Sequence, residues 1–177
     1  MSLIRKSCED DIDAITAIYA HHVQHGTGTF EIEAPSATEM ATRHSDVLSK
    51  GLPYLVVEMD GHVVGFAYCN WFKPRPAYRF SAEDSIYLSP QAQGAGLGRA
   101  LLSELIAQAT TIGLRKLIAV IGDSRNAASI GLHRAVGFTD VGILKSCGWK
   151  FDQWQDVVLM ECVLGQGDAT APPLVSA

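Results

Sequence analysis

The feature that most constrains this 177-residue chain is a glycine-rich turn between a strand-like segment and an amphipathic helix. The strand-like segment spans residues 84–89, the turn spans 91–100, and the helical pattern continues to about 112. Glycines in such a turn leave backbone N–H groups uncovered by side chains. The N-terminus of the following helix adds partial positive charge. The sequence therefore predicts a cradle for a phosphate or pyrophosphate group.

The spacing of the glycines excludes two common phosphate-binding motifs. A P-loop needs a Lys-Ser/Thr pair after the glycines, and none follows here. A dinucleotide fingerprint needs a third glycine three positions after Gly96, where this chain has Arg99. The remaining pattern is Gln-x-x-Gly-x-Gly, formed by Gln91, Gly94 and Gly96.

The periodicity along the whole chain predicts an α/β fold, with a mixed sheet and helices on both of its faces. Residues 1–164 are expected to form a single domain, and residues 165–177 read as a flexible C-terminal tail. The pair Asp60-Gly61 predicts a hairpin turn, and residues 36–39 resemble a capping box. The expected order is βααβββαβαββ, with strands near 3–5, 53–59, 62–71, 84–89, 116–121, 138–143 and 156–164, and helices near 8–24, from 36, 97–112 and 126–136. The strand at 116–121 is apolar from Leu117 onward, which predicts burial on both faces.

The composition narrows the class of protein further. Hydrophobic residues make up 47% and charged residues 19%, which is typical of a globular domain. The net charge of −5 disfavours nucleic acid as a partner, and no apolar run is long enough to cross a membrane. Four scattered cysteines without a Cys-x-x-Cys motif favour a reducing cytoplasm over a zinc site. His21 and His25 lie four residues apart but have no evident third ligand, so no metal is expected.

Several further segments, in a consistent order, carry a resemblance to a known family. They lie at 18–19, 27–31 (TGTFE), 51–56, 75–79 (RPAYR), 83–88 (EDSIYL), 126–133 (NAASIGLH), 137–138 and 150–154 (KFDQW). With the glycine turn, they make the chain resemble the GNAT acetyltransferases over nearly its whole length, and more narrowly the phosphinothricin and methionine sulfone N-acetyltransferase group. The resemblance implies a twisted, mostly antiparallel sheet of about seven strands with four helices. It also implies acetyl-CoA as acyl donor, no metal, direct transfer in a ternary complex, and a homodimer.

The cofactor is expected to be held along the predicted strand, turn and helix. The backbone cradle comprises Gln93, Gly94, Ala95, Gly96, Leu97 and Gly98, with Arg99 nearby. Gln93 departs from the family, which often has a cation or another polar residue there. The resemblance implies that the backbone of Ile86, Tyr87 and Leu88 pairs with the pantetheine arm, that an N–H near Leu88 stabilises the oxyanion, and that Asn126 and Ser129 contact the cofactor. The alternative role for Asn126 is to cap the following helix.

Two residues are candidates for proton transfer. Glu83, at the start of the cofactor strand, is the candidate general base for the acceptor amine, although a lone strand-end glutamate is usually a surface carboxylate. His133 occupies a position where many relatives have a tyrosine that protonates the leaving thiolate. An imidazolium has a suitable pKa for that step. The alternative is a half-buried histidine that is bonded to a helix carbonyl.

The acceptor is expected to bind near Glu83. Arg75, Tyr78 and Arg79 lie in a proline-stiffened loop, and an arginine fork matches a substrate carboxylate. Phe30 and Trp71 are candidate walls of the pocket, although aromatic residues more often fill the core. The region 70–79 varies among family members with different substrates, so it leaves the exact acceptor open.

The resulting hypothesis is an acetyl-CoA-dependent N-acetyltransferase that acts on a small amino acid such as phosphinothricin, methionine sulfone or methionine sulfoximine. One alternative is acetylation of peptides or proteins, which would need an open groove. The other is a non-catalytic acetyl-CoA sensor, which would not need Glu83 and His133. Trp149 and Trp154 in the closing strands are candidate dimer contacts.

Overall fold

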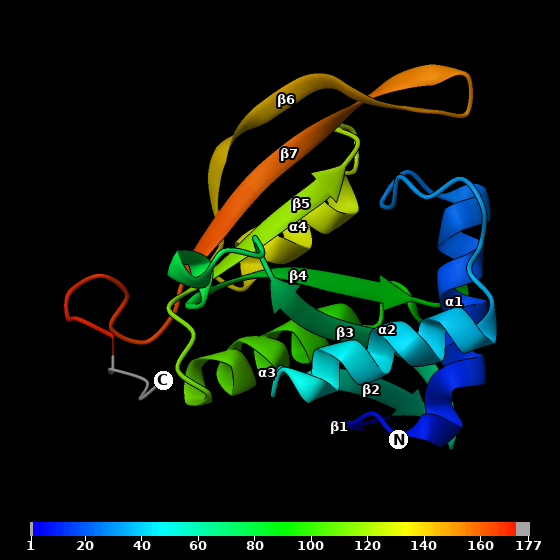
Figure 1. Cartoon of the computed structure of the whole chain (residues 1–177). Coiled ribbons are helices and arrows are strands. Elements are labelled where there is room, and N and C mark those ends of the chain that lie inside the picture. The colour runs from blue at the N-terminus through cyan, green and yellow to red at the C-terminus, as the bar shows by residue number, and fades with distance from the viewer. Residues whose placement is uncertain (1, 173–177) are drawn as a thin grey trace.

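A computed structural model describes residues 2–172 of the chain as a seven-stranded sheet with helices on both faces (Figure 1). The strand order across the sheet is β1-β2-β3-β4-β5-β7-β6. All neighbouring strands are antiparallel except β4 and β5, which run parallel. The strands are β1 Ser2–Lys6, β2 Tyr54–Met59, β3 His62–Trp71, β4 Ser81–Leu88, β5 Lys116–Gly122, β6 Thr139–Lys150 and β7 Gln153–Val163. The predicted fold class and order of elements are confirmed.

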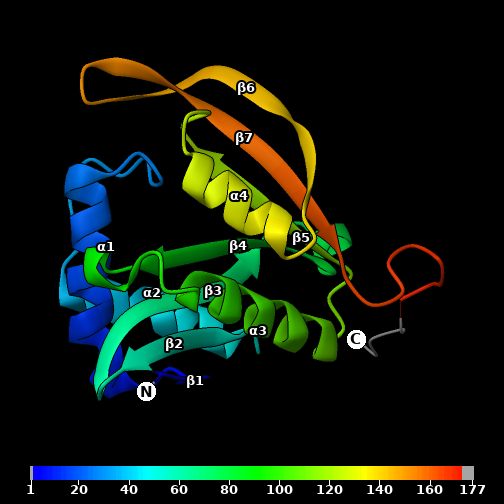
Figure 2. The same ribbon diagram turned by 180° about the vertical axis from the view of Figure 1, so that it is seen from behind.

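Four α-helices cover the sheet in two pairs. They are α1 Ile12–His25, α2 Ala37–Ser49, α3 Leu97–Thr111 and α4 Ala127–Ala135. Helices α1 and α2 pack on one face, and α3 and α4 lie on the other, which faces the viewer in Figure 2. As predicted, Ser36 caps α2, because its hydroxyl accepts a hydrogen bond from the Glu39 amide at 3.2 Å. The Glu39 side chain pairs with Arg43 instead of closing a capping box.

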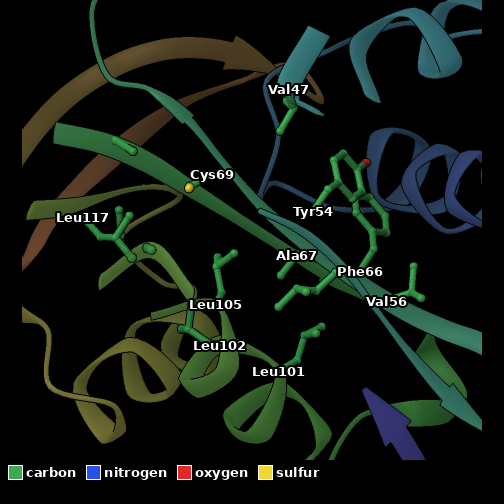
Figure 3. Packing of buried hydrophobic residues seen from close by; sticks show 14 of the residues in the cluster. Val47, Tyr54, Val56, Phe66, Ala67, Cys69, Leu101, Leu102, Leu105 and Leu117 are labelled. Carbon is green, nitrogen blue, oxygen red and sulfur yellow. The ribbon is translucent and has the colours of Figure 1, made fainter. Parts of the chain in front are cut away.

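The core lies on both sides of β2 and β3. Leu101, Leu102 and Leu105 of α3 are fully buried on one side, next to Ala67 of β3 (Figure 3). Leu101 and Leu105 fall at the helical spacing expected for a buried stripe, and burial of such side chains contributes about 1.5–3 kcal/mol each. The packed helix therefore holds the glycine turn at its N-terminus in a fixed place.

The parallel strands β4 and β5 separate part of the way along their length. Their pairing runs from Ser81 and Lys116 to Asp84 and Ala119. Beyond that point β4 pairs only with β3, and β5 pairs only with β7. The prediction that β5 is buried on both faces is wrong at Val120, which is 36% exposed because it lies on the wall of the opening.

The hairpin of β6 and β7 is much longer than predicted. Strand β6 continues to Lys150 and β7 begins at Gln153, and Lys150 pairs with Gln153. The two residues between them, Phe151 and Asp152, both have positive φ angles, at 54° and 55°. Two-residue hairpin turns need this geometry, which asparagine and glycine usually supply. The turn therefore has none of the residues that normally mark it.

The described part of the C-terminal segment, after β7, is hydrogen-bonded to Arg115, which directly precedes β5. The carbonyl of Gly167 and the hydroxyl of Thr170 accept hydrogen bonds from Arg115 at 3.4 and 3.3 Å. Residues 173–177 of the expected tail lie outside the described residues. Among residues 2–172, no helix combines the length and apolar character needed to cross a membrane.

Candidate active site

A cavity of about 890 Å³ occupies the opening between β4 and β5. Its walls come from the loop after α1, both separating strands, the glycine turn and α4. One continuous space therefore connects the phosphate cradle expected on α3 with the carboxylate of Glu83. Such a concave space with a few polar groups is the usual form of a small-molecule site.

The glycine turn has the backbone geometry expected of a phosphate cradle. Gly94 and Gly96 have φ angles of 79° and 77°, which side chains other than that of glycine rarely tolerate. Gly96 is also the N-cap of α3, so the helix begins directly at the turn. An added Cβ at either glycine would meet no other atom within 4 Å, so the turn faces open space. This arrangement fits the pyrophosphate of acetyl-CoA.

The structure brings most of the predicted cofactor residues into this cavity. Ala95 and Leu97 are absent from its lining, and Leu97 is instead buried in the core. The lining includes Ile86, Tyr87, Leu88, Gln93, Gly94, Gly96, Gly98, Arg99, Asn126 and Ser129. Asn126 also caps α4, because its side-chain oxygen accepts a hydrogen bond from the Ser129 amide at 3.2 Å.

The end of β4 is held by a histidine that the sequence did not single out for this role. His22 of α1 donates from Nε2 to the carbonyl oxygen of Leu88 at 2.8 Å. Burial lowers the pKa of His22, so the ring is neutral at ordinary pH. His22 also lines the cavity. His22 therefore links α1 to β4, the strand that is expected to hold the cofactor arm.

Glu83 lies on the cavity wall near the point where β4 and β5 separate. Burial raises the pKa of its carboxyl group, and the neighbouring charge of Asp84 raises it further. A base with a raised pKa holds a proton better after taking it from an amine. The environment of Glu83 is therefore suited to the role predicted for it.

His133 forms a buried pair with Asp84, and the two side chains are 3% and 1% exposed. Its Nδ1 donates to the Ser129 carbonyl oxygen at 2.7 Å, and its Nε2 lies 2.9 Å from Asp84 Oδ2. Burial opposes a charge on His133, but the hydrogen bond with Asp84, the negative charge of Asp84 and the hydrogen bond to the Ser129 carbonyl together outweigh it, so the pKa of His133 is raised. The other oxygen of Asp84, Oδ1, has no hydrogen-bond partner among residues 2–172. His133 thus makes the hydrogen bond to a helix carbonyl that was expected for a purely structural histidine, and it also lines the cavity.

The predicted acceptor residues lie in two separate places. Phe30 lines the cavity, together with Tyr19 and Tyr68. The other four are exposed and outside the cavity lining: Trp71 at the end of β3, and Arg75, Tyr78 and Arg79 on the segment between β3 and β4. The Arg79 guanidinium stacks over Phe80 and donates to the Pro76 carbonyl oxygen.

No metal cluster occurs in the part of the chain that the structure describes. Within residues 2–172, no three His, Cys, Asp or Glu side chains come together in a way that could hold a metal ion. The rings of His21 and His25 lie 4.9 Å apart and have no third ligand of this kind.

Comparison with known proteins places this site in a family. The profile of the "Acetyltransferase (GNAT) family" matches residues 16–138. The chain is 53% identical over 169 residues to phosphinothricin N-acetyltransferase of Alcaligenes faecalis, covering 96% of this chain and 86% of that protein. It is 36% identical to the L-methionine sulfoximine/L-methionine sulfone acetyltransferase of Salmonella typhimurium, covering 92% and 95%.

A solved structure agrees with the assignment. The phosphinothricin acetyltransferase of Sinorhizobium meliloti, in complex with acetyl-CoA, superposes with a TM-score of 0.95. It is 45% identical in sequence, and the match covers 97% of this chain and 93% of that one. The chain therefore belongs to the GNAT acetyltransferase family and is an N-acetyltransferase that takes its acetyl group from acetyl-CoA.

Proposed function

We propose that the acceptor is the amino group of a small amino acid with a tetrahedral phosphorus or sulfur in its side chain. Phosphinothricin, methionine sulfone and methionine sulfoximine are the candidates, and the names of the two relatives above support this class. The observation that carries the proposal is the single cavity shared by the glycine turn, Glu83 and Phe30. It has room for a pantetheine arm and a small acceptor, both within reach of one carboxylate.

Acetyl-CoA supplies an acetyl group activated as a thioester, and the chain's own residues handle the protons. Glu83 takes a proton from the acceptor ammonium, directly or through water. The free amine then attacks the acetyl carbon, and a backbone N–H near Leu88 stabilises the charge on the acetyl oxygen. The nitrogen loses its second proton to water, the C–S bond breaks, and the thiolate leaves.

We propose that the pair of His133 and Asp84 provides the proton that the thiolate needs. Asp84 favours the protonated form of His133 and contributes to its raised pKa. Because Nε2 is bonded to Asp84, the transfer requires that bond to open or a water molecule to carry the proton. Water alone is the alternative donor, and replacing His133 distinguishes the two through the pH dependence of turnover.

The test is acetyl-CoA-dependent thiol release with a panel of amines. We expect rapid turnover with phosphinothricin, methionine sulfone and methionine sulfoximine, and little with polyamines, aminoglycosides or short peptides. Turnover with peptides but not with free amino acids would replace the proposal with peptide or protein acetylation. Binding of acetyl-CoA without acetylation of any amine would favour a sensor.

We propose that the chain acts as a homodimer in the cytoplasm, with residues 1–164 as one acetyltransferase domain. The β6–β7 hairpin supports a dimer, because it exposes Val141, Ile143, Trp149, Phe151 and Trp154. Trp149 and Trp154 are 52% and 62% exposed and pack edge to face, with ring centroids 5.3 Å apart. The cytoplasmic location is supported by four unpaired cysteines. Sedimentation of the wild type and of Trp154→Ser tests the dimer.

A further inference from the structure

Lys150, the last residue of β6, is buried without an ion-pair partner. The residue is only 5% exposed, although lysine is rarely buried unless it is paired. Its ammonium donates to the carbonyl oxygens of Gly26 and Thr29, both at 2.8 Å. No carboxylate in the described part of the chain forms an ion pair with it. The two carbonyl oxygens are therefore the hydrogen-bond partners that compensate for its loss of water.

Both carbonyls belong to one loop, residues 26–31, which we call the acceptor loop. Its first five residues line the cavity. In Figures 1 and 2 this loop, directly after α1, extends toward the end of the sheet where the β6–β7 hairpin turns. The two hydrogen bonds join residues that are 124 and 121 positions apart along the chain. Lys150 thus connects the first part of the cavity wall to the last hairpin of the fold.

Apart from the Gly26 amide, which donates to the His22 carbonyl oxygen at 3.0 Å, the other contacts of the loop are made mainly by side chains; Glu31, for example, pairs with Arg43 at 2.6 Å. The ring of Phe30 fits against Gly148 and Gly122, where an added Cβ would lie 2.5 and 3.0 Å from ring atoms. The hydroxyl of Thr27 makes one long hydrogen bond to Asp123, at 3.3 Å. Thr29 and Tyr19 bond through their hydroxyl groups at 2.9 Å. Lys150 is the residue from outside the loop whose side chain fixes two of the loop's carbonyl groups.

Burial of the ammonium is costly and favours its neutral form. It lowers the pKa of Lys150, and the negative charge of Glu31 opposes that change. A buried charged group often adds little to the stability of the fold. One use of a buried charged group is to specify a single conformation. The position of Lys150 between the hairpin and the cavity wall indicates which conformation it specifies.

We propose that Lys150 is a positioning residue for the acceptor, because its ammonium fixes the acceptor loop as the wall of the cavity that Glu83 shares. With the loop fixed, Phe30 packs against the acceptor, and water is kept from the thioester. This proposal rests on the proposed function only for the identity of the acceptor. The two hydrogen bonds from Lys150 to the loop are the same whichever acceptor binds.

The test replaces Lys150 with methionine, which keeps most of the length and removes the donors. We expect the KM for phosphinothricin to rise at least about tenfold, the effect of losing roughly one charge-assisted hydrogen bond. The KM for acetyl-CoA should stay within about twofold, because the glycine turn is untouched. Thiol release without any acceptor should increase. Lys150→Arg, which keeps a cation with several donors, should recover part of the acceptor affinity.

Hydrogen exchange gives a readout that needs neither substrate. Amides 27–30 should exchange faster in Lys150→Met, while those of β5 stay as protected as in the wild type. Lys145→Met is the matched control, because Lys145 lies in the same strand, pairs with Asp156 and has a side chain that is 71% exposed. It should leave both kinetic constants and loop exchange unchanged.

A second variant disturbs the loop while Lys150 remains. Gly148→Ala places a methyl group against the Phe30 ring and should raise the acceptor KM without changing that for acetyl-CoA. It substitutes for Lys150→Met if that variant does not fold. The proposal is overturned if a folded Lys150→Met protein keeps wild-type loop exchange, or if both KM values rise together. Slow acetylation of every amine, with faster loop exchange, would contradict the proposed acceptor class and leave the role of Lys150 standing.

Discussion

The two ends of the cavity are built in different ways. The cofactor end comes from one continuous stretch, in which the end of β4, the glycine turn and the start of α3 follow one another along the chain. The acceptor end brings the acceptor loop, Glu83 and the β6–β7 hairpin together from distant positions. The comparison indicates that the cofactor end depends on local backbone geometry, whereas the acceptor end depends on long-range side-chain contacts.

The largest effect is expected for Glu83→Gln, which removes the base and leaves the cofactor end intact. Turnover should fall about 100- to 10,000-fold, the usual contribution of a positioned base. The dissociation constant of acetyl-CoA should be unchanged, as measured by calorimetry. In the wild type, kcat/KM should rise with pH through a pKa above the ordinary carboxyl value of 4.5, because burial raises that of Glu83. Full turnover by Glu83→Gln would show that another group is the base.

The next largest effect is expected for His133→Leu, which should lower the free energy of unfolding. His133 lies between the two ends of the cavity. The substitution leaves the Asp84 carboxylate buried without its donor, which should cost about 3–5 kcal/mol. For a chain of this size, the melting temperature should fall by about 2–4 °C per kcal/mol. Asp84→Asn should cost less, because its amide can donate to the neutral ring. Equal losses in the two variants would contradict this account of the pair.

The same pair should make stability depend on pH in a defined direction. The pKa of His133 is raised in the folded protein, so the folded state binds the proton more tightly than the unfolded chain. The contribution of the pair is fully present below a pH of about 6.5 and is lost as the pH rises through the higher folded-state value. The difference in melting temperature between wild type and His133→Leu should therefore narrow as the pH rises above about 6.5. A difference that widened instead would mean that the histidine is neutral in the folded protein.

The cofactor end is tested by Gly96→Val. A β-branched residue at the positive φ of Gly96 is strained by about 1–3 kcal/mol and should reshape the turn. The KM for acetyl-CoA should rise about tenfold. The KM for the acceptor should change little, which is the reverse of the result expected for Lys150→Met. Steady-state kinetics with each substrate varied in turn would measure the two KM values for both variants. If Gly96→Val and Lys150→Met changed the same KM values, the distinction between the two ends of the cavity would be wrong.

The smallest effect is expected for Arg75→Ala. Arg75 is exposed and outside the cavity lining, so its attraction for an acceptor carboxylate is screened by solvent. We expect the acceptor KM to rise about threefold at low salt and to return to the wild-type value near 1 M salt. A rise that persists in high salt would mean that Arg75 contacts the acceptor directly.

The sequence predicted the fold and the cofactor end because both depend on local patterns. The strand–turn–helix unit could be identified because Gly94 and Gly96 lie between a strand-like segment and a helical pattern of leucines. The β6–β7 hairpin was underestimated because its turn uses Phe151 and Asp152 at positive φ, where sequence patterns favour glycine or asparagine.

The residues that sequence reasoning missed act over long distances in the chain. Asp84 pairs with a residue 49 positions away, His22 with one 66 positions away, and Lys150 with residues more than 120 away. One signal was available: consecutive strand residues point to opposite faces, so Glu83 and Asp84 cannot both face solvent, and one carboxylate needs a buried partner. Nothing in the sequence identifies that partner as His133 or places Lys150 beside the acceptor loop.

The central claim is that one cavity holds both substrates together, so that the acetyl group passes directly from the thioester to the amine. The most direct test is the initial rate of thiol release with acetyl-CoA varied at several fixed concentrations of phosphinothricin. Double-reciprocal lines that intersect are expected, because a ternary complex must form before transfer. Parallel lines, with transfer of acetyl to the enzyme in the absence of the amine, would contradict the account.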